Sequence, residues 1–289
     1  MVNPLKKLLP KRFRKDVTVI PVVKLSGAIM GSSTPLRPGL SLSGAAPLLS
    51  RAFDQKGAPA VAIVVNSPGG SPVQSRLIFQ RIRDLAEEKD KKVLIFVEDV
   101  AASGGYMIAC AGDEIIADPS SIVGSIGVVS GSFGFVEAIK KLGIERRVHT
   151  AGNNKSTLDP FQPEKPEDVE HLKTLQREVH DTFIDLVKSR RGEKLVDDET
   201  LFSGLFWSGK RGLDLGLVDA LGDLRGVLRE RYGENVRPVL IQGGRRLFGR
   251  KPSGVSTSGM MDFSAIGGGF AERLISAAEE RALWARFGL

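Results

Sequence analysis

Two uninterrupted apolar runs of strand length constrain the fold of this chain more than any other feature. Ala60 to Val65 and Val93 to Val97 contain only apolar side chains. Strands that are apolar on both faces are typical of a parallel sheet covered by helices on both sides. The segment between them, Val73 to Glu88, repeats its apolar residues at helical spacing. Strand, loop, helix and strand in this order predict a right-handed βαβ unit and therefore an α/β fold.

Further segments extend this alternation on both sides. Helical spacing or strand-length apolar runs predict strands at Val17–Leu25 and Glu114–Ala117 and helices at Leu40–Phe53, Tyr106–Ala111 and Glu167–Arg191. Gly204 to Leu224 mixes glycines with apolar residues, which indicates a turn and a short helix. The sequence therefore predicts several βαβ units that contribute to one mostly parallel sheet.

The chain of 289 residues divides into three predicted parts. Residues 1–15 form a basic N-terminal arm, and residues 16–240 form the main α/β domain. Residues 241–289 combine a Gly/Ser-rich linker, Gln242 to Gly269, with an amphipathic helix at Ala271 to Phe287. A lone terminal helix of this kind is expected to dock on its own domain or on a neighbouring subunit.

The net charge of +7 is concentrated in the N-terminal arm. Six basic side chains precede the first acidic residue, Asp16, and the rest of the chain is close to balanced. This distribution argues against a nucleic-acid-binding face on the main domain. The arm also carries leucines and a phenylalanine, so it would either lie on an anionic membrane surface or stay solvated. With no apolar stretch of about 18 residues, we expect no transmembrane helix and a location in the cytoplasm or peripherally on the cytoplasmic membrane.

Cysteine and histidine usage argues against disulfide and metal chemistry. The single Cys110 excludes an internal disulfide and lies in an apolar segment, where we interpret it as a core residue. The three histidines show no zinc-ligand spacing. The sequence therefore predicts no metal and no cofactor.

Two loops that follow predicted strands carry candidate catalytic groups. Asn66 to Gly70 follows the first apolar strand, and Ser103 lies after the second, between two alanines and two glycines. Active sites of parallel sheets form at the carboxyl ends of the strands, so Gly70 and Ser103 are expected to meet there. The N–H of Gly104, at the start of a helix, and the N–H of Gly70 would form an oxyanion hole.

A serine nucleophile needs a base, and no histidine lies near these loops in the sequence. Lys155 is the alternative base, because its neighbours in Gly152 to Ser156 are uncharged hydrogen-bonding residues. A lysine, with an ordinary pKa of about 10.4, can accept a proton only if burial keeps it neutral. Taken singly, each segment is an ordinary turn, a helix cap or a surface charge, and only their combination predicts a hydrolase.

Five segments in the same order resemble the signal peptide peptidase A family, the S49 group of serine peptidases. They are Asn66–Gly70, Ala102–Tyr106, Gly124–Val128, Gly152–Ser156 and Trp207–Gly209 with Gly216–Asp219. The resemblance spans roughly residues 17 to 235 and assigns the main domain, residues 16–240, to the peptidase. It implies a ClpP/crotonase-like fold, a spiral of βαβ units with a parallel sheet.

The resemblance also implies roles for individual residues. Ser103 would be the nucleophile and Lys155 the general base, with Gly70 and Gly104 forming the oxyanion hole and Ser125 orienting the lysine. The family cleaves signal-peptide remnants and other small or unfolded peptides, and it assembles into ring or dome homo-oligomers. This chain resembles the short, single-repeat form, in which each subunit needs neighbours to complete a chamber. Many members carry an N-terminal membrane anchor, which we do not expect here.

Two other functions remain open from the sequence. A crotonase-like CoA-thioester enzyme would share the fold and the glycine loop, and binding of an acyl-CoA would identify it. A non-catalytic oligomeric scaffold at a membrane surface would use the basic arm, and it would show salt-sensitive liposome binding that is lost without residues 1–15.

Overall fold

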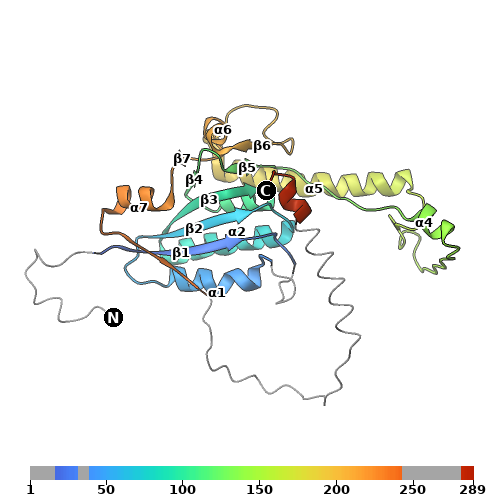
Figure 1. Cartoon of the computed structure of the whole chain (residues 1–289), viewed down its shortest axis with the longest axis horizontal. Helices are drawn as coiled ribbons and strands as arrows, with labels where there is room; N and C mark the ends of the chain where they lie inside the picture. Colours follow the sequence, from blue (N-terminus) through green and yellow to red (C-terminus); the bar gives the residue numbers. More distant parts are fainter. Residues whose placement is uncertain (1–16, 32–38, 243–280) are drawn as a thin grey trace, which may run out of the picture.

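The computed structural model describes residues 17–31, 39–242 and 281–289 (Figure 1). An eight-stranded sheet forms its centre, with strand order β6-β5-β3-β2-β1-β8 and with β4 and β7 branching from β3. The strands are β1 (Val19–Ser26), β2 (Ala60–Ser67), β3 (Lys92–Ala102), β4 (Glu114–Ala117), β5 (Ile122–Gly124), β6 (Phe206–Ser208), β7 (Ala220–Leu221) and β8 (Arg237–Leu240). The helices are α1 (Leu42–Phe53), α2 (Pro72–Lys89), α3 (Gly104–Ala109), α4 (Val136–Lys141), α5 (Pro166–Arg191), α6 (Gly209–Asp214) and α7 (Leu224–Tyr232).

The strand β3 is shared between two branches of the sheet. Its first half pairs with β4 and its last three residues, Val100 to Ala102, pair with β5. Every pairing between these strands is parallel except the one between β5 and β6. The carboxyl end of β3 therefore lies beyond the branch to β4 and beside β5.

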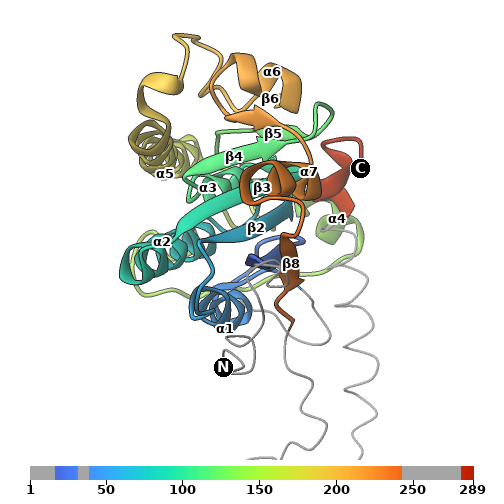
Figure 2. The same ribbon diagram turned by 90° about the vertical axis from the view of Figure 1, so that its left-hand side faces the viewer.

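Helices cover both faces of the central strands, as the apolar run in β2 predicts (Figures 1 and 2). Ile63 and Val65 lie in the large core that contains side chains of α1, α2, α3 and α5. Ala62 and Val64 point to the other face and lie in a second cluster with Leu228 of α7. Successive side chains of a strand face opposite sides, so both faces of this strand must be apolar.

The structure confirms the predicted strands and helices of the main domain, with differences at their ends. β3 continues to Ala102, five residues beyond the predicted end, because its polar residues face outward and find partners. Glu98 pairs with Lys24 at 2.7 Å, and the carboxylate of Asp99 accepts a hydrogen bond from Asn66 at 2.7 Å. The helix α3 begins at Gly104, two residues earlier than predicted.

Several elements lacked a sequence signal strong enough to predict them: β5, α4, α7 and β8. The most distinctive is α4, which lies in residues 128–165, a segment we call the α4 extension. It projects away from the sheet toward the far end of α5 (Figure 1). Its apolar side chains are unusually exposed, including Val129 (69%), Phe133 (80%), Leu142 (73%) and Ile144 (54%).

The predictions for the two ends of the chain fall mainly outside the described residues. These are the basic arm, the Gly/Ser-rich linker and the first part of the terminal helix, of which residues 281–285 are helical. None of the helices in the described ranges is long and apolar enough to cross a membrane.

Candidate active site

The glycine loop after β2 directs one backbone N–H into a pocket. The N–H of Ile29 donates to the carbonyl of Gly69, and the N–H of Ser71 donates to the carbonyl of Ile29, both at 2.8 Å. Because these bonds come from the neighbours of Gly70 in a parallel bridge, the N–H of Gly70 itself points away from Ile29. Gly70 has φ +139°, and a Cβ there would overlap the carbonyl of Ile29. Only glycine can occupy this position without moving the loop.

Ser103 occupies a sharp turn between β3 and α3. Its backbone has φ 52° and ψ −123°, a conformation that non-glycine residues seldom adopt. The turn is fixed by the N–H of Ser103, which donates to the carbonyl of Gly124 at 2.8 Å, and by its carbonyl, which accepts from the N–H of Met107 at 3.0 Å. The hydroxyl makes no hydrogen bond to any described residue and is free to react. Such strain at a partly exposed serine is typical of a functional site.

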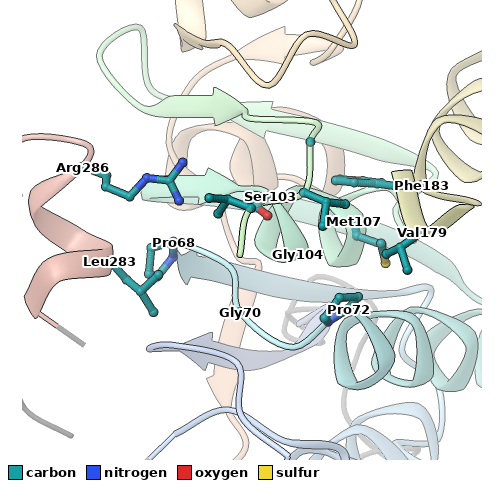
Figure 3. A pocket seen from close by; sticks show the side chains of 13 residues that line it. Pro68, Gly70, Pro72, Ser103, Gly104, Met107, Val179, Phe183, Leu283 and Arg286 are labelled. Carbon is teal, nitrogen blue, oxygen red and sulfur yellow. The ribbon is translucent and has the colours of Figure 1, made fainter. Parts of the chain in front are cut away.

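Gly104 brings a second backbone N–H to the same place. As the first residue of α3, it has no carbonyl within the helix to accept its N–H. A Cβ at Gly104 would overlap the hydroxyl of Ser75, and one at Gly69 would lie 2.8 Å from the Cβ of Ser103. Glycines therefore let the two loops approach closely. Gly70, Ser103 and Gly104 line one pocket (Figure 3).

This pocket has different surfaces on the two sides of Ser103. Met107 of α3 and Val179 and Phe183 of α5 form an apolar end (Figure 3). On the other side of Ser103 lie Leu283 and Arg286, which come from the C-terminal segment. A chain lying across Ser103 would contact an apolar surface on one side and a cationic side chain on the other.

Ser125 and His180 lie beside Ser103 in an adjoining polar hollow. Ser125 is buried and has φ 52°, and its N–H donates to the carbonyl of Leu205 at 2.7 Å. His180 of α5 lies with Nε2 at 3.0 Å from the carbonyl oxygen of Ile126. Sequence reasoning missed His180, because it lies in the middle of a long helix without any surrounding motif. Ser125 lines the same hollow as Ser103, and its predicted role in orienting the lysine stays a prediction.

Lys155 is not brought to Ser103 within one copy of the chain. It is exposed and lies in the α4 extension. Nearby, the N–H of Leu158 donates to Asp168 in the first turn of α5 at 3.3 Å. Val179, which lines the Ser103 pocket, lies eleven residues further along this helix, roughly 16 Å at a rise of about 1.5 Å per residue. The predicted base therefore lies near the first turn of α5, and the predicted nucleophile lies near the middle of this helix.

The buried residues Tyr106 and Cys110, in α3 and at its C-terminal end, are structural. Cys110 is buried, and burial raises the pKa of its thiol to about 12. A thiol with so high a pKa is not a nucleophile near neutral pH, which confirms the interpretation of Cys110 as a core residue. The hydroxyl of Tyr106 donates to the carbonyl of Leu217 at 2.7 Å. Within the described ranges, no group of three or more His, Cys, Asp or Glu side chains could hold a metal ion.

Comparison with known proteins adds a family to this geometry. The model of peptidase family S49 matches residues 86–234. A chloroplastic serine protease SPPA of Arabidopsis thaliana is 31% identical over 209 residues, which cover 71% of this chain and 31% of that protein. A putative protease of Methanocaldococcus jannaschii is 33% identical over 186 residues, covering 64% of this chain and 59% of that protein.

A relative with much higher identity carries a different kind of name. A Brucella abortus protein named Na(+)/H(+) antiporter NhaA is 63% identical over 286 residues. The match covers 99% of this chain but only 39% of that protein. The name describes the longer protein, whereas the family match lies in the segment that the two share.

A solved structure supports the fold. A variant of the 1510-N membrane-bound stomatin-specific protease, in complex with a substrate peptide, superposes with a TM-score of 0.50. The sequences are 18% identical, and the match covers 80% of this chain and 95% of that chain. At this identity the likeness concerns the fold alone, and it confirms the predicted α/β fold of the ClpP/crotonase kind.

Proposed function

Because this chain belongs to peptidase family S49, we propose that it is a serine endopeptidase with Ser103 as nucleophile and Lys155 as general base. The observation that carries the proposal is the strained turn at Ser103, which places an unbonded hydroxyl in one pocket with Gly70 and Gly104. A structural serine at a turn would be expected to satisfy its hydroxyl locally.

The reaction follows from these groups. The hydroxyl of Ser103 attacks the carbonyl carbon of a peptide bond while the base takes its proton. The N–H groups of Gly70 and Gly104 donate to the oxygen that becomes negative, and each such donor contributes about 3 kcal/mol in comparable enzymes. The base then gives the proton to the leaving amine, and water releases the acyl group from Ser103.

In this proposal the lysine comes from a second copy of the chain. One observation in support is the separation of Lys155 from Ser103 within one copy. Lys155 lies in the segment that contacts the first turn of α5, whereas Ser103 lies beside the middle of this helix. Another is the α4 extension itself, which carries Lys155 and exposes large apolar side chains that a second subunit would cover. The polar hollow around Ser125 offers a hydroxyl that would orient the amine of the partner subunit's Lys155.

The substrates we propose are small or unfolded peptides, including remnants of signal peptides. Support for this comes from the apolar end of the pocket, where Met107, Val179 and Phe183 would accept an apolar side chain. A homo-oligomer that encloses its active sites would limit substrates to chains flexible enough to enter.

A complementation experiment tests the dyad and its division between subunits. Ser103→Ala and Lys155→Ala are each expected to abolish cleavage of a quenched unfolded-protein substrate while retaining the fold. When the two variants are co-expressed with different tags and purified together, some interfaces combine an intact Ser103 with an intact Lys155. In a random assembly about one site in four would be complete, so activity should return to roughly a quarter of the wild-type value.

The alternatives give different results. A dyad within one copy would leave the mixed assembly inactive. Activity in Lys155→Ala alone would exclude Lys155 as the base, and His180, which lies in the same hollow as Ser103, would be the next candidate to substitute. Activity in Ser103→Ala alone would exclude the serine mechanism.

A further inference from the structure

Arg286 is the one charged side chain among the described residues that line the Ser103 pocket. It also lines the adjoining polar hollow with Ser103 and Ser125, so it borders both hollows that contain Ser103. Its place at the site cannot be read from a local sequence pattern, because Arg286 lies near the C-terminal end of the chain, far from Ser103 in the sequence. Figure 3 shows Arg286 across Ser103 from the apolar end.

The neighbouring residue Phe287 anchors this segment to the domain. Phe287 is 7% exposed and packs in a cluster with Val100 and Ala102 of β3, the strand that ends at Ser103. Its ring meets the ring of Phe206 edge to face, with 5.0 Å between the ring centres. Arg286 is therefore attached to a fixed point on the wall of the site.

The charge of Arg286 has no acidic partner among the described residues. Its guanidinium lies over the ring of Phe287 in a cation–π contact, with 5.9 Å between Cζ and the ring centre. An exposed arginine commonly pairs with a nearby carboxylate, yet no acidic side chain is among the described residues that line the two hollows around Ser103. Arginine has donors arranged to fit a carboxylate, so an anionic group on the substrate would be its natural partner.

We propose that Arg286 binds a carboxylate of the peptide substrate, on the side of the scissile bond opposite the apolar end of the pocket. This inference rests on the proposed peptidase function and adds a substrate class to it. The preferred peptide has an apolar side chain on one side of the cut and a negative charge on the other. An extended chain advances by about 3.3 Å per residue, so the two positions that follow the cut are the ones we test for this charge.

The carboxylate has two sources, an acidic side chain or the C-terminus of a short peptide. Both present the same group to Arg286, and a set of matched substrates separates them. The set consists of quenched peptides of one sequence with an apolar residue before the cut. Each carries either Glu or Gln at the two positions after the cut and ends in either a free carboxylate or an amide.

The values of kcat/KM for these peptides are compared among the wild type, Arg286→Gln and the matched control Arg281→Gln. Arg281 is in the same segment but lines neither hollow around Ser103. For a partly exposed ion pair, we expect the wild type to favour the anionic peptides by about threefold to tenfold. Arg286→Gln should lose this preference, and Arg281→Gln should keep it. Added salt should reduce it, because exposed charges are screened.

Equal kcat/KM for anionic and neutral peptides in the wild type would overturn the inference and leave the peptidase proposal standing. A preference that persists in Arg286→Gln would overturn it as well. If the wild type cuts none of the peptides, the proposed function fails. The role of Arg286 is then tested by measuring how tightly the protein binds the anionic peptide. In that case the affinities of Ser103→Ala and of Ser103→Ala with Arg286→Gln for the anionic peptide are measured by fluorescence anisotropy. Equal affinities would overturn the role of Arg286.

Discussion

At the scale of single residues, the site depends on backbone positions that tolerate almost no change of side chain. Ser103 holds a conformation that costs of order 1–3 kcal/mol in a non-glycine residue, and the surrounding hydrogen bonds must compensate for it. Gly70 and Gly104 are fixed by contact, since a Cβ at either one would overlap a neighbouring group. The proposed oxyanion hole would therefore consist of backbone whose conformation these contacts hold in place.

Gly70→Ala tests this arrangement. The new methyl group would overlap the carbonyl of Ile29 and turn the N–H of residue 70 out of the pocket. We expect kcat to fall by about 100- to 1000-fold, as for the loss of one oxyanion donor in comparable enzymes. Steady-state kinetics on a quenched peptide measures the change.

Gly44→Ala is the matched control for that substitution. Gly44 lies inside α1, where the nearest atom to an added Cβ is 3.8 Å away. Replacing a helical glycine with alanine should stabilise the fold by roughly 0.5–1 kcal/mol and leave kcat unchanged. An unchanged kcat in Gly70→Ala would show that the N–H of Gly70 is not part of the oxyanion hole.

Sequence patterns could predict some of these residues and not others. Gly70, Ser103 and Gly104 directly follow apolar strands, so their meeting at one sheet edge follows from the topology. Lys155 lies in the α4 extension, and no apolar periodicity in that segment predicts the direction in which it leaves the domain. Arg286 reaches the site through packing of Phe287, a contact between segments nearly two hundred positions apart that leaves no local pattern.

At the scale of elements, α5 connects the pocket wall to a buried ion pair at its C-terminal end. Arg191 has a side chain that is only 3% exposed, and it pairs with Asp219 at 2.7 Å. Lys194 pairs with the other oxygen of the same carboxylate at 2.7 Å. The N–H of Ile115 in β4 also donates to Asp219, at 2.8 Å. One carboxylate thus fixes the end of the helix whose middle forms the apolar side of the pocket.

Asp219→Asn should destabilise the fold by about 3 kcal/mol at pH 7, because it leaves Arg191 buried without its counterion. Burial alone raises the pKa of Asp219, but hydrogen bonds from Arg191 and Lys194 outweigh it and hold the pKa below its usual value. A lowered pKa means that the stabilisation is present above the carboxyl's ordinary pKa and is lost as the pH falls through the lowered one. The difference between wild type and variant should therefore shrink below about pH 4.

Urea denaturation at neutral and acidic pH measures this difference. Asp214→Asn is the control, since its carboxylate is 60% exposed and lies 3.8 Å from Arg211. Exposed pairs of this kind contribute about 0.5 kcal/mol or less. Equal free energies of unfolding for wild type and Asp219→Asn at pH 7 would contradict a structural role of the ion pair.

The sequence predicts the elements that carry a clear apolar pattern better than those that do not. The apolar runs of β2 and β3 and the periodicity of α2 and α5 identify these elements, because their burial demands those patterns. The length of β3 was underestimated, since Glu98 and Asp99 resemble the start of a loop until Lys24 and Asn66 are seen beside them. β5, with three residues, is too short for any period to appear, although it accepts the hydrogen bond that fixes Ser103.

At the scale of the whole molecule, the three most exposed large apolar side chains among the described residues lie on the α4 extension. Phe133, Leu142 and Ile144 are all more than half exposed there. Large apolar side chains grouped on a projecting segment are typical of an interface between subunits. The same extension carries the predicted general base, so self-association and catalysis should depend on one surface.

Leu142→Asp is therefore expected to weaken self-association and activity together, because a buried charge at an interface is costly. Analytical ultracentrifugation and peptide cleavage at the same protein concentration measure the two effects. Val196→Asp introduces the same charge at a 41% exposed valine outside the extension and should change neither. An active Leu142→Asp monomer would contradict a catalytic role for assembly.

The separation of Ser103 from Lys155 within one copy also bears on how the enzyme would be kept harmless. If Ser103 and Lys155 form the proposed dyad, a single subunit would hold the two groups too far apart to cleave a peptide and would therefore be inactive before assembly. Assembly itself would be the activating event, and the proteolytic activity would increase more steeply than in proportion to the protein concentration. Dilution would return the subunits to dormancy without any chemical change.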